Sequence, residues 1–153
     1  MPTDNAVNTL DDLLQQALLQ GASDVHFESG EDFFRARFRI DGILRVAATP
    51  ALTLRDAVVS RIKVLARMDI AEKRLPQDGR IQYPHLGQTV DLRISSLPTV
   101  YGEKIVVRIL NYSRERPGLA ALGYEPDERA KLIQALGQPH GLILMTGPTG
   151  SGK

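Results

Sequence analysis

The sequence predicts an α/β (α+β) domain with a largely antiparallel sheet and flanking helices, followed by the beginning of a nucleotide-binding α/β domain. Between residues 24 and 110, several short segments alternate apolar and polar residues, the pattern of strands with one buried face. Two other segments carry apolar residues at helical spacing. A glycine-rich segment at residues 147–153 follows a short apolar run and has the spacing of a phosphate-binding loop.

The composition is that of a globular protein. The chain has 153 residues, of which 42% are hydrophobic, and this length suits one domain and part of another. Its net charge of +1 favours neither nucleic acid nor an anionic membrane as a partner. The absence of cysteine excludes a cysteine zinc site within this stretch and fits a reducing cytoplasm. No apolar run approaches the ~20 residues of a membrane helix, so we expect no direct membrane insertion.

Two helices are expected in the first domain. The first has a capping box formed by Thr9 and Asp12, and it ends at Gly21. Its apolar stripe consists of Leu10, Leu13, Leu14, Ala17 and Leu18. The second helix has a capping box formed by Thr53 and Asp56. Its buried stripe consists of Leu54, Ala57, Val58, Ile62 and Leu65, whereas Arg55, Arg61, Lys63 and Arg67 are expected to be solvated.

Strands are expected on either side of the second helix, beginning with residues 24–28. In the next strand, 33–40, one face carries Phe34, Ala36, Phe38 and Ile40, and the other carries Phe33, Arg35, Arg37 and Arg39. Asp41-Gly42 predicts a tight hairpin into a return strand at 43–46. Later strands are expected at 81–83, 90–95 and 105–110. No aromatic platform accompanies the arginine stripe, so we expect it to pack against acidic neighbours or another subunit rather than nucleic acid.

Beyond the strands, the domain organisation changes. We predict a first domain at residues 1–110 and, because periodicity fades, an interdomain linker at 111–126. The remainder, 127–153, is expected to begin the nucleotide-binding domain. It should contain a helix from about residue 127 to 136 with Leu132, Ile133 and Leu136 facing inward, and then a strand at 142–146.

The phosphate-binding loop consists of Gly147, Pro148, Thr149, Gly150, Ser151, Gly152 and Lys153. In this motif, backbone amides cradle phosphate oxygens and the lysine reaches the outer phosphates. The Ser or Thr that holds Mg²⁺ would follow Lys153, so we expect ATP and Mg²⁺ as cofactors but no metal ligand within this chain. Because the helix after such a loop helps to hold the phosphate, the chain alone is expected to be a poor nucleotide binder and inactive.

Two arginines are candidate catalytic residues. Charge alone indicates a solvated loop at residues 72–80, but Pro76 and Gly79 stiffen it. Arg80 and Arg93 fall on neighbouring predicted strands, and projection from one surface would let both clamp a phosphate. The solvated loop and the clamp both remain open at this point. For His26, between acidic residues and with no second His or Cys nearby, surface hydrogen bonding is expected rather than metal ligation.

Several blocks, taken in order, resemble the type II/type IV secretion ATPase family. They are residues 22–28, 37–42, 74–80, 91–95, 97–99, 101–110, 122–123 and 147–153. The resemblance implies a PAS-like N-terminal domain followed by the truncated start of a RecA-like ATPase domain. It further implies that Arg80 and Arg93 reach nucleotide held by the RecA-like domain, with Arg74 and Arg108 as weaker candidates, and that Leu122-Gly123 approaches the base.

For the full-length parent, the resemblance implies a hexameric cytoplasmic motor, peripheral to the inner membrane, that works with inner-membrane platform proteins. It would couple ATP hydrolysis to type II secretion pseudopilus or type IV pilus assembly. The alternative is a noncatalytic PAS-like sensor or docking module attached to a phosphate-binding loop. A sensor should have an apolar pocket with a few polar groups, whereas aromatic residues are only 5% of this chain. A P-loop kinase would not account for the complete preceding domain.

Overall fold

The computed structural model describes residues 5–110 and 118–147. The chain divides into two compact units, residues 1–113 and 114–153, with the division inside the range expected to be a linker. Unit 1 contains the predicted sheet, and unit 2 contains the predicted third helix.

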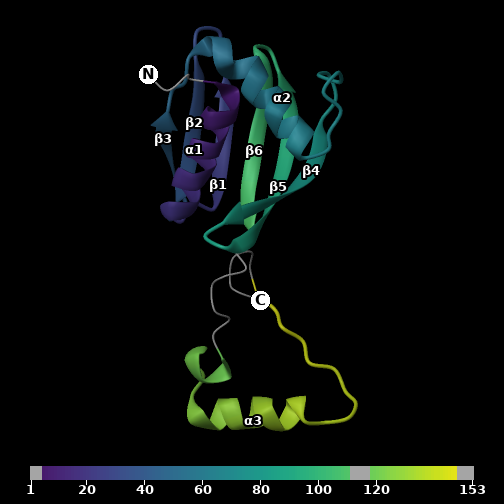
Figure 1. Ribbon diagram of the computed structural model, residues 1–153. Helices are drawn as coiled ribbons and strands as arrows, with labels where there is room; N and C mark the ends of the chain where they lie inside the picture. The colour runs from purple at the N-terminus through teal and green to yellow at the C-terminus, as the bar shows by residue number, and fades with distance from the viewer. Residues whose placement is uncertain (1–4, 111–117, 148–153) are drawn as a thin grey trace. The chain divides into compact units, whose positions relative to one another are not determined.

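Unit 1 is built on one sheet of six strands in the order β3-β2-β1-β6-β5-β4, with antiparallel pairing throughout. The strands are β1 (Asp24–Ser29), β2 (Phe34–Ile40), β3 (Ile43–Ala48), β4 (Gln77–His85), β5 (Gln88–Thr99) and β6 (Gly102–Leu110). Two helices, α1 (Ala6–Leu19) and α2 (Arg55–Leu65), lie over one face of the sheet (Figure 1). The expected fold class, a mixed α/β domain with an antiparallel sheet, is confirmed.

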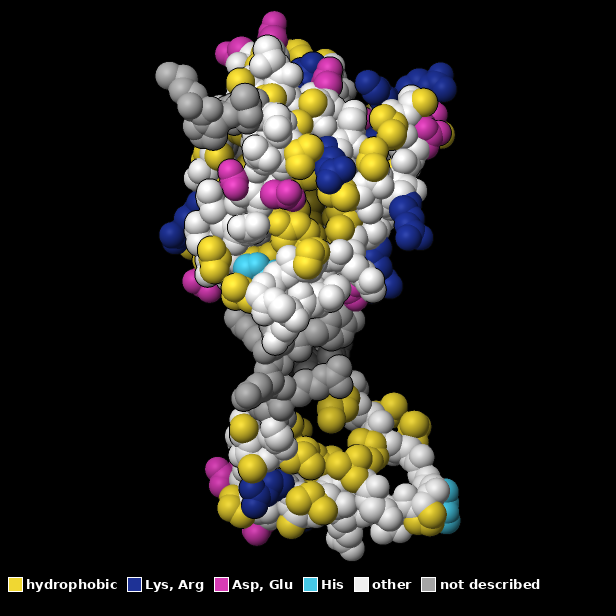
Figure 2. Space-filling view, in the orientation of Figure 1, with side chains coloured by type: hydrophobic (Ala, Val, Ile, Leu, Met, Phe, Trp, Pro, Cys, Tyr) yellow, Lys and Arg dark blue, Asp and Glu magenta, His cyan; other side chains and the backbone are white. Residues whose placement is uncertain are grey.

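The core lies between the helices and the sheet. It buries the predicted stripe of α1 and the predicted apolar face of β2, with Leu18 and Ile40 partly buried. Figure 2 shows this helix-covered side of unit 1, where hydrophobic side chains gather near the middle. On α2 the buried residues are Val58, Val59, Ile62 and Lys63. The prediction is therefore wrong for Ala57, which is exposed, and for Lys63, which is buried.

Both helices begin differently from the prediction. The side chain of Asn5 caps α1 by accepting hydrogen bonds from the amides of Val7 and Asn8 at 3.0 and 2.9 Å. The predicted capping box is therefore wrong, because the helix starts one turn before Thr9. At α2, a 3₁₀ turn, η1 (Leu52–Leu54), leads directly into the helix, which has no side-chain cap. This turn takes the place of the second predicted capping box.

Two glycines have structural roles, one in a tight turn and one at a close packing contact. Asp41 and Gly42 both have positive φ, 50° and 79°, as a two-residue hairpin between β2 and β3 requires. Gly79 has a different role, because a Cβ atom there would lie 2.6 Å from the carbonyl oxygen of Ala66 at the end of α2. The backbone of β4 therefore passes close under α2. Since β4 begins at Gln77, the predicted polar loop ends earlier than residue 80.

Unit 2 contains a 3₁₀ turn, η2 (Leu119–Ala121), and the helix α3 (Pro126–Leu136). The helix is confirmed, but its predicted inward face is not buried: Ile133 and Leu136 are 52% and 56% exposed, and Leu132 is half-buried. Residues 142–146 do not form the predicted strand. A strand requires a hydrogen-bonding neighbour, and residues 118–147 contain no other extended segment paired with it. Among the described residues, no helix is long and apolar enough to cross a membrane.

Candidate functional site

The face of the sheet opposite the helices carries one row of charged residues across five strands. Each member lies directly opposite the next in the strand register. The row is Arg39 (β2), Asp24 (β1), Arg108 (β6), Arg93 (β5) and Arg80 (β4). Because successive side chains of a strand point to opposite faces, residues opposite one another in the register share a face. Arg80 and Arg93 therefore project from the same surface of unit 1, as a phosphate clamp requires.

Asp24 is the only acidic member of this row. Its side chain is 8% exposed and accepts a hydrogen bond from Ser23 Oγ at 2.8 Å. Arg108 Nε lies 3.1 Å from one carboxylate oxygen, and Arg39 Nε lies 3.4 Å from the other. Burial acts to raise the pKa of Asp24, but the hydrogen bonds from Ser23 and Arg108 and the charge of Arg108 hold that pKa below its ordinary value. The carboxylate is therefore ionised at neutral pH.

A second carboxylate pairs with two arginines of the β2 stripe. Glu28 pairs with Arg35 at 2.8 Å, Arg37 at 3.3 Å and Lys104 at 3.5 Å. Burial raises the pKa of Glu28, but the hydrogen bond from Arg35 and the charges of Arg37 and Lys104 lower it further than burial raises it. Arg35 also stacks over the ring of Phe33 at 4.7 Å. The prediction that the β2 arginines pack against acidic neighbours is confirmed.

Arg80 and Arg93 differ from these arginines. Both are exposed, and within the described part of the chain neither side chain has a hydrogen bond or an ion pair. Asp78 is two residues from Arg80 and lies opposite Ser95, and Asp91 is two residues from Arg93 and lies opposite Gln82. Both aspartates are on the same face as the arginines, but neither forms an ion pair with them. Like charges directly opposite one another destabilise a sheet. An anion bound between these guanidinium groups would remove that repulsion and satisfy their donors.

His26 lies on the same face, between the two carboxylates of β1. Both ring nitrogens are buried without a hydrogen-bond partner, so the predicted surface hydrogen bonding is wrong. The reason is that the adjacent carboxylates are already engaged by arginines. Burial, followed by the charge of Lys104, lowers the pKa of His26. No group of three metal-ligating side chains occurs in the described residues, so His26 has no partners for a metal site.

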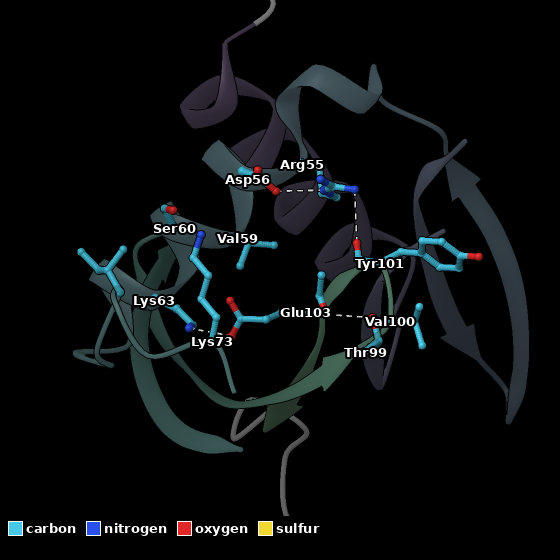
Figure 3. Close-up of a pocket in the computed structure, with 12 residues that line it drawn as sticks. Arg55, Asp56, Val59, Ser60, Lys63, Lys73, Thr99, Val100, Tyr101 and Glu103 are labelled. Atoms are coloured by element: carbon cyan, nitrogen blue, oxygen red, sulfur yellow. Dashed lines mark hydrogen bonds and ion pairs between the residues drawn. The ribbon is translucent and has the colours of Figure 1, made fainter. Parts of the chain in front are cut away.

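A charged hollow lies on the helix side of unit 1, between α2 and the turn that joins β5 to β6 (Figure 3). On its floor, the ammonium of Lys63 lies 2.6 Å from Glu103 Oε1, and both side chains are almost fully buried. Ser96 Oγ donates to the same carboxylate oxygen at 2.8 Å. At the rim, Arg55 donates to Asp56 Oδ1 and to the carbonyl oxygen of Tyr101. These charges are therefore mutually compensated.

The buried ion pair also holds the loop that leads into Arg80. Lys63 donates to the carbonyl oxygen of Glu72 at 2.6 Å. The side chain of Gln77 donates to the carbonyl oxygens of Asp69 and Glu72 and accepts from the amide of Asp69. Arg74 remains 89% exposed and lies 3.6 Å from Glu72. The sequence analysis missed Lys63 and Glu103, although the alternation of β6 places Glu103 on the buried face with Ile105 and Val107.

The phosphate-binding loop is not described beyond its first residue. Of residues 147–153, only Gly147 lies in the described range, so Pro148, Thr149, Gly150, Ser151, Gly152 and Lys153 lie outside it. The same holds for residues 111–117 of the expected linker. Within the described residues, the candidate site is therefore the arginine row of unit 1.

Comparison with known proteins gives long matches. Residues 3–153 match the family described as type II/IV secretion system protein. The chain is 51% identical over 148 residues to the type IV pilus assembly ATPase PilB of Acinetobacter baylyi, a match that covers 96% of this chain and 26% of that protein. It is 44% identical over 147 residues to the type II secretion system ATPase E of Vibrio cholerae, covering 96% of this chain and 29% of that protein. The chain thus spans less than a third of the length of these relatives.

Two solved structures share the fold. The pilus retraction motor PilT matches with a TM-score of 0.60 and 21% identity, over 93% of this chain and 39% of that one. The Legionella pneumophila ATPase DotB matches with a TM-score of 0.60 and 19% identity, over 99% of this chain and 40% of that one. Together with the family match over nearly all residues, these findings show that the chain belongs to the type II/IV secretion system protein family.

Proposed function

We propose that this chain is the N-terminal portion of a motor ATPase, in which Arg80 and Arg93 clamp the phosphates of bound ATP. The observation that carries the proposal is the pair of arginines opposite one another on β4 and β5, exposed and without partners among the described residues. A guanidinium group can bind phosphate oxygens through two parallel hydrogen bonds. In phosphoryl transfer, such a group stabilises the charge that develops on the transferred phosphate.

The cofactors would be ATP and Mg²⁺. The arginine row suits a polyphosphate, because it offers unpaired donors on adjacent strands. The glycine-rich loop 147–153 would hold the phosphates through backbone amides, with Lys153 on the outer ones. Mg²⁺ would neutralise phosphate charge when bound, and the residues assigned here supply no ligand for it.

The proposed motor is a cytoplasmic homohexamer, peripheral to the inner membrane, that works with inner-membrane platform proteins of a type II secretion or type IV pilus system. Relatives from both systems match at similar identity, 44% and 51%, which supports the general role without separating the two. A RecA-like fold for residues 127–153, after a linker at 111–126, is part of the same proposal. The sensor alternative gains no support, because five of the twelve residues that line the hollow in unit 1 are charged, whereas a sensor pocket should be mainly apolar.

The proposal is tested by ATP hydrolysis in the full-length parent, with Arg80→Ala and Arg93→Ala made separately. We expect each variant to lose about 100-fold in turnover or more, because a preorganised charge at the reacting phosphate is removed. Arg35→Ala is the matched control, since it removes an arginine from the same face that is paired with Glu28. Unchanged turnover in both test variants, with the fold intact, would exclude the clamp.

A further inference from the structure

We propose that Asp24 is a positioning residue whose carboxylate holds Arg108 beside Arg93 and so adds a third arginine to the clamp. This inference rests on the proposed function of Arg80 and Arg93. It goes beyond that function by assigning a role to the acidic member of the row. In this arrangement, the terminal nitrogens of Arg108 face the polyphosphate and its Nε faces Asp24.

The geometry gives Asp24 a central place. It lies opposite Arg108 on β6, and Arg108 lies in turn opposite Arg93 on β5. The carboxylate is nearly buried and is also held by the hydroxyl of Ser23. A buried side chain with several partners is itself fixed in position. Asp24 is therefore a rigid attachment point for the side chain that it binds.

The contact uses the inner part of the guanidinium group. Arg108 donates to Asp24 through Nε at 3.1 Å, and its side chain is 67% exposed. Its two terminal nitrogens have no partner in the described residues. Because the guanidinium group is planar, fixing Nε restricts the direction of its terminal nitrogens. The other arginine on Asp24 is different, since Arg39 uses a terminal nitrogen to donate to the carbonyl oxygen of Gly42.

The charge of Asp24 and its positioning of Arg108 have opposite effects on anion binding. A carboxylate beside an anion site opposes anion binding by Coulomb repulsion, so removing its charge should tighten binding. A carboxylate that orders an arginine promotes binding, because an ordered donor loses less side-chain entropy when the anion arrives. We infer that ordering dominates at Asp24. Replacing the charge alone therefore separates the two effects by the sign of the change.

Asp24→Asn and Glu28→Gln form a matched pair of variants. Both remove one negative charge from the same face of β1 and keep the side-chain shape. Glu28, however, contacts Arg35, Arg37 and Lys104, none of which belongs to the row. The probe is inorganic tripolyphosphate titrated into the 153-residue chain at low salt. Arginine Nε–Hε signals in NMR spectra report both the affinity and the state of Arg108.

We expect Asp24→Asn to weaken tripolyphosphate binding by about 3- to 10-fold despite the added net positive charge. The Arg108 Nε–Hε signal should move toward that of a free guanidinium. Glu28→Gln should leave the affinity equal or slightly tighter. If the two variants tighten binding equally, or if the Arg108 signal does not respond to Asp24→Asn, the positioning role is wrong.

An Arg93→Ala arm separates this inference from the proposed function. If the wild-type chain binds tripolyphosphate, Arg93→Ala weakens binding and Asp24→Asn behaves like Glu28→Gln, the clamp stands and only the role of Asp24 fails. If Arg93→Ala has no effect on binding, the clamp fails and the role of Asp24 fails with it. If the wild-type chain binds no tripolyphosphate, the role of Asp24 fails, whereas the clamp is decided by the turnover of the full-length parent. Backbone amide spectra of each variant verify that the sheet is intact.

Discussion

Both halves of the exposed sheet face carry arginines, but the arginines are ion-paired in one half and unpaired in the other. On β1 and β2, Arg35 and Arg37 are paired with Glu28, and Arg39 is paired with Asp24. On β4 and β5, Arg80 and Arg93 have no partner in the described residues. Arg108, on β6 between the halves, is paired on one side only. Paired arginines stabilise the sheet. Unpaired arginines directly opposite one another repel and destabilise it, and a bound anion would offset that repulsion.

This contrast indicates which half of the face is available for function. A basic stripe in a sequence does not by itself identify a binding surface, because carboxylates on neighbouring strands pair with such arginines in the fold. Here the more conspicuous stripe, three alternating arginines on one strand, is the one whose arginines are ion-paired. The two arginines that are unpaired, Arg80 and Arg93, are 13 positions apart in the sequence and lie opposite one another on β4 and β5.

The largest expected effect on stability comes from breaking the strand that carries Arg80. Gly79→Ala places a Cβ atom 2.6 Å from a backbone oxygen of Ala66. Overpacking of this kind costs about 1–3 kcal/mol, because backbone rather than a flexible side chain must move. We expect the free energy of unfolding, measured by chemical denaturation, to fall by about that amount. Gly118→Ala is the control, since its Cβ would meet nothing within 4 Å; equal losses in both would contradict the packing argument.

The second prediction concerns pH and the paired half. The pKa values of Asp24 and Glu28 lie below the ordinary values of aspartate and glutamate side chains. A carboxyl group with a depressed pKa in the folded state contributes stability above its unfolded pKa, and this contribution is lost as pH falls through the folded pKa. We therefore expect stability to decrease as pH is lowered below about 4.5. Denaturation curves of Glu28→Gln should show a shallower acid loss than the wild type; an identical pH profile would contradict it.

Much of the arginine geometry follows from local patterns in the sequence. Alternation along residues 33–40 predicts which face each arginine of that strand occupies. The predicted strand at 81–83, which Arg80 directly precedes, is next along the chain to the predicted strand at 90–95, which contains Arg93. Neighbouring strands joined by a short turn pair with one another, so the pairing of these two strands can be predicted from the sequence. The buried Phe34, Ala36 and Phe38 confirm the assignment of faces.

Other features depend on contacts between distant segments. Asp24 meets Arg108 across 84 positions, and Lys63 meets Glu103 only because α2 packs over β6. Lys63 is expected to be solvated because it lies outside the apolar stripe predicted for the second helix. Lysine is almost never buried unless it is paired, and the local sequence does not show its partner Glu103. The helix starts differ from the prediction for a local reason: Asn5 caps α1 one turn before Thr9, and the η1 turn leads into α2 in place of a cap at Thr53.

The third prediction is that Glu28→Gln and Arg93→Ala differ in their effect on stability at neutral pH. Glu28→Gln removes the shared partner of Arg35, Arg37 and Lys104, and we expect a loss of about 1 kcal/mol, because these side chains are partly exposed and screened. The measurement is again denaturant unfolding. A gain in stability on losing Glu28 would mean that its ion pairs do not support the sheet.

The smallest effect, and the sharpest test of the comparison, is expected for Arg93→Ala. It removes a guanidinium group placed opposite Arg80 on one side and Arg108 on the other. Relief of that repulsion should leave the free energy of unfolding unchanged or raise it by about 0.5 kcal/mol at low salt. The gain should shrink as salt is added, because exposed charges are screened. Arg35→Ala, which removes a paired arginine, should instead lower stability. If Arg93→Ala also lowers stability, Arg93 contributes to the sheet itself, and the division of the face into a half with paired arginines and a half with unpaired arginines is wrong.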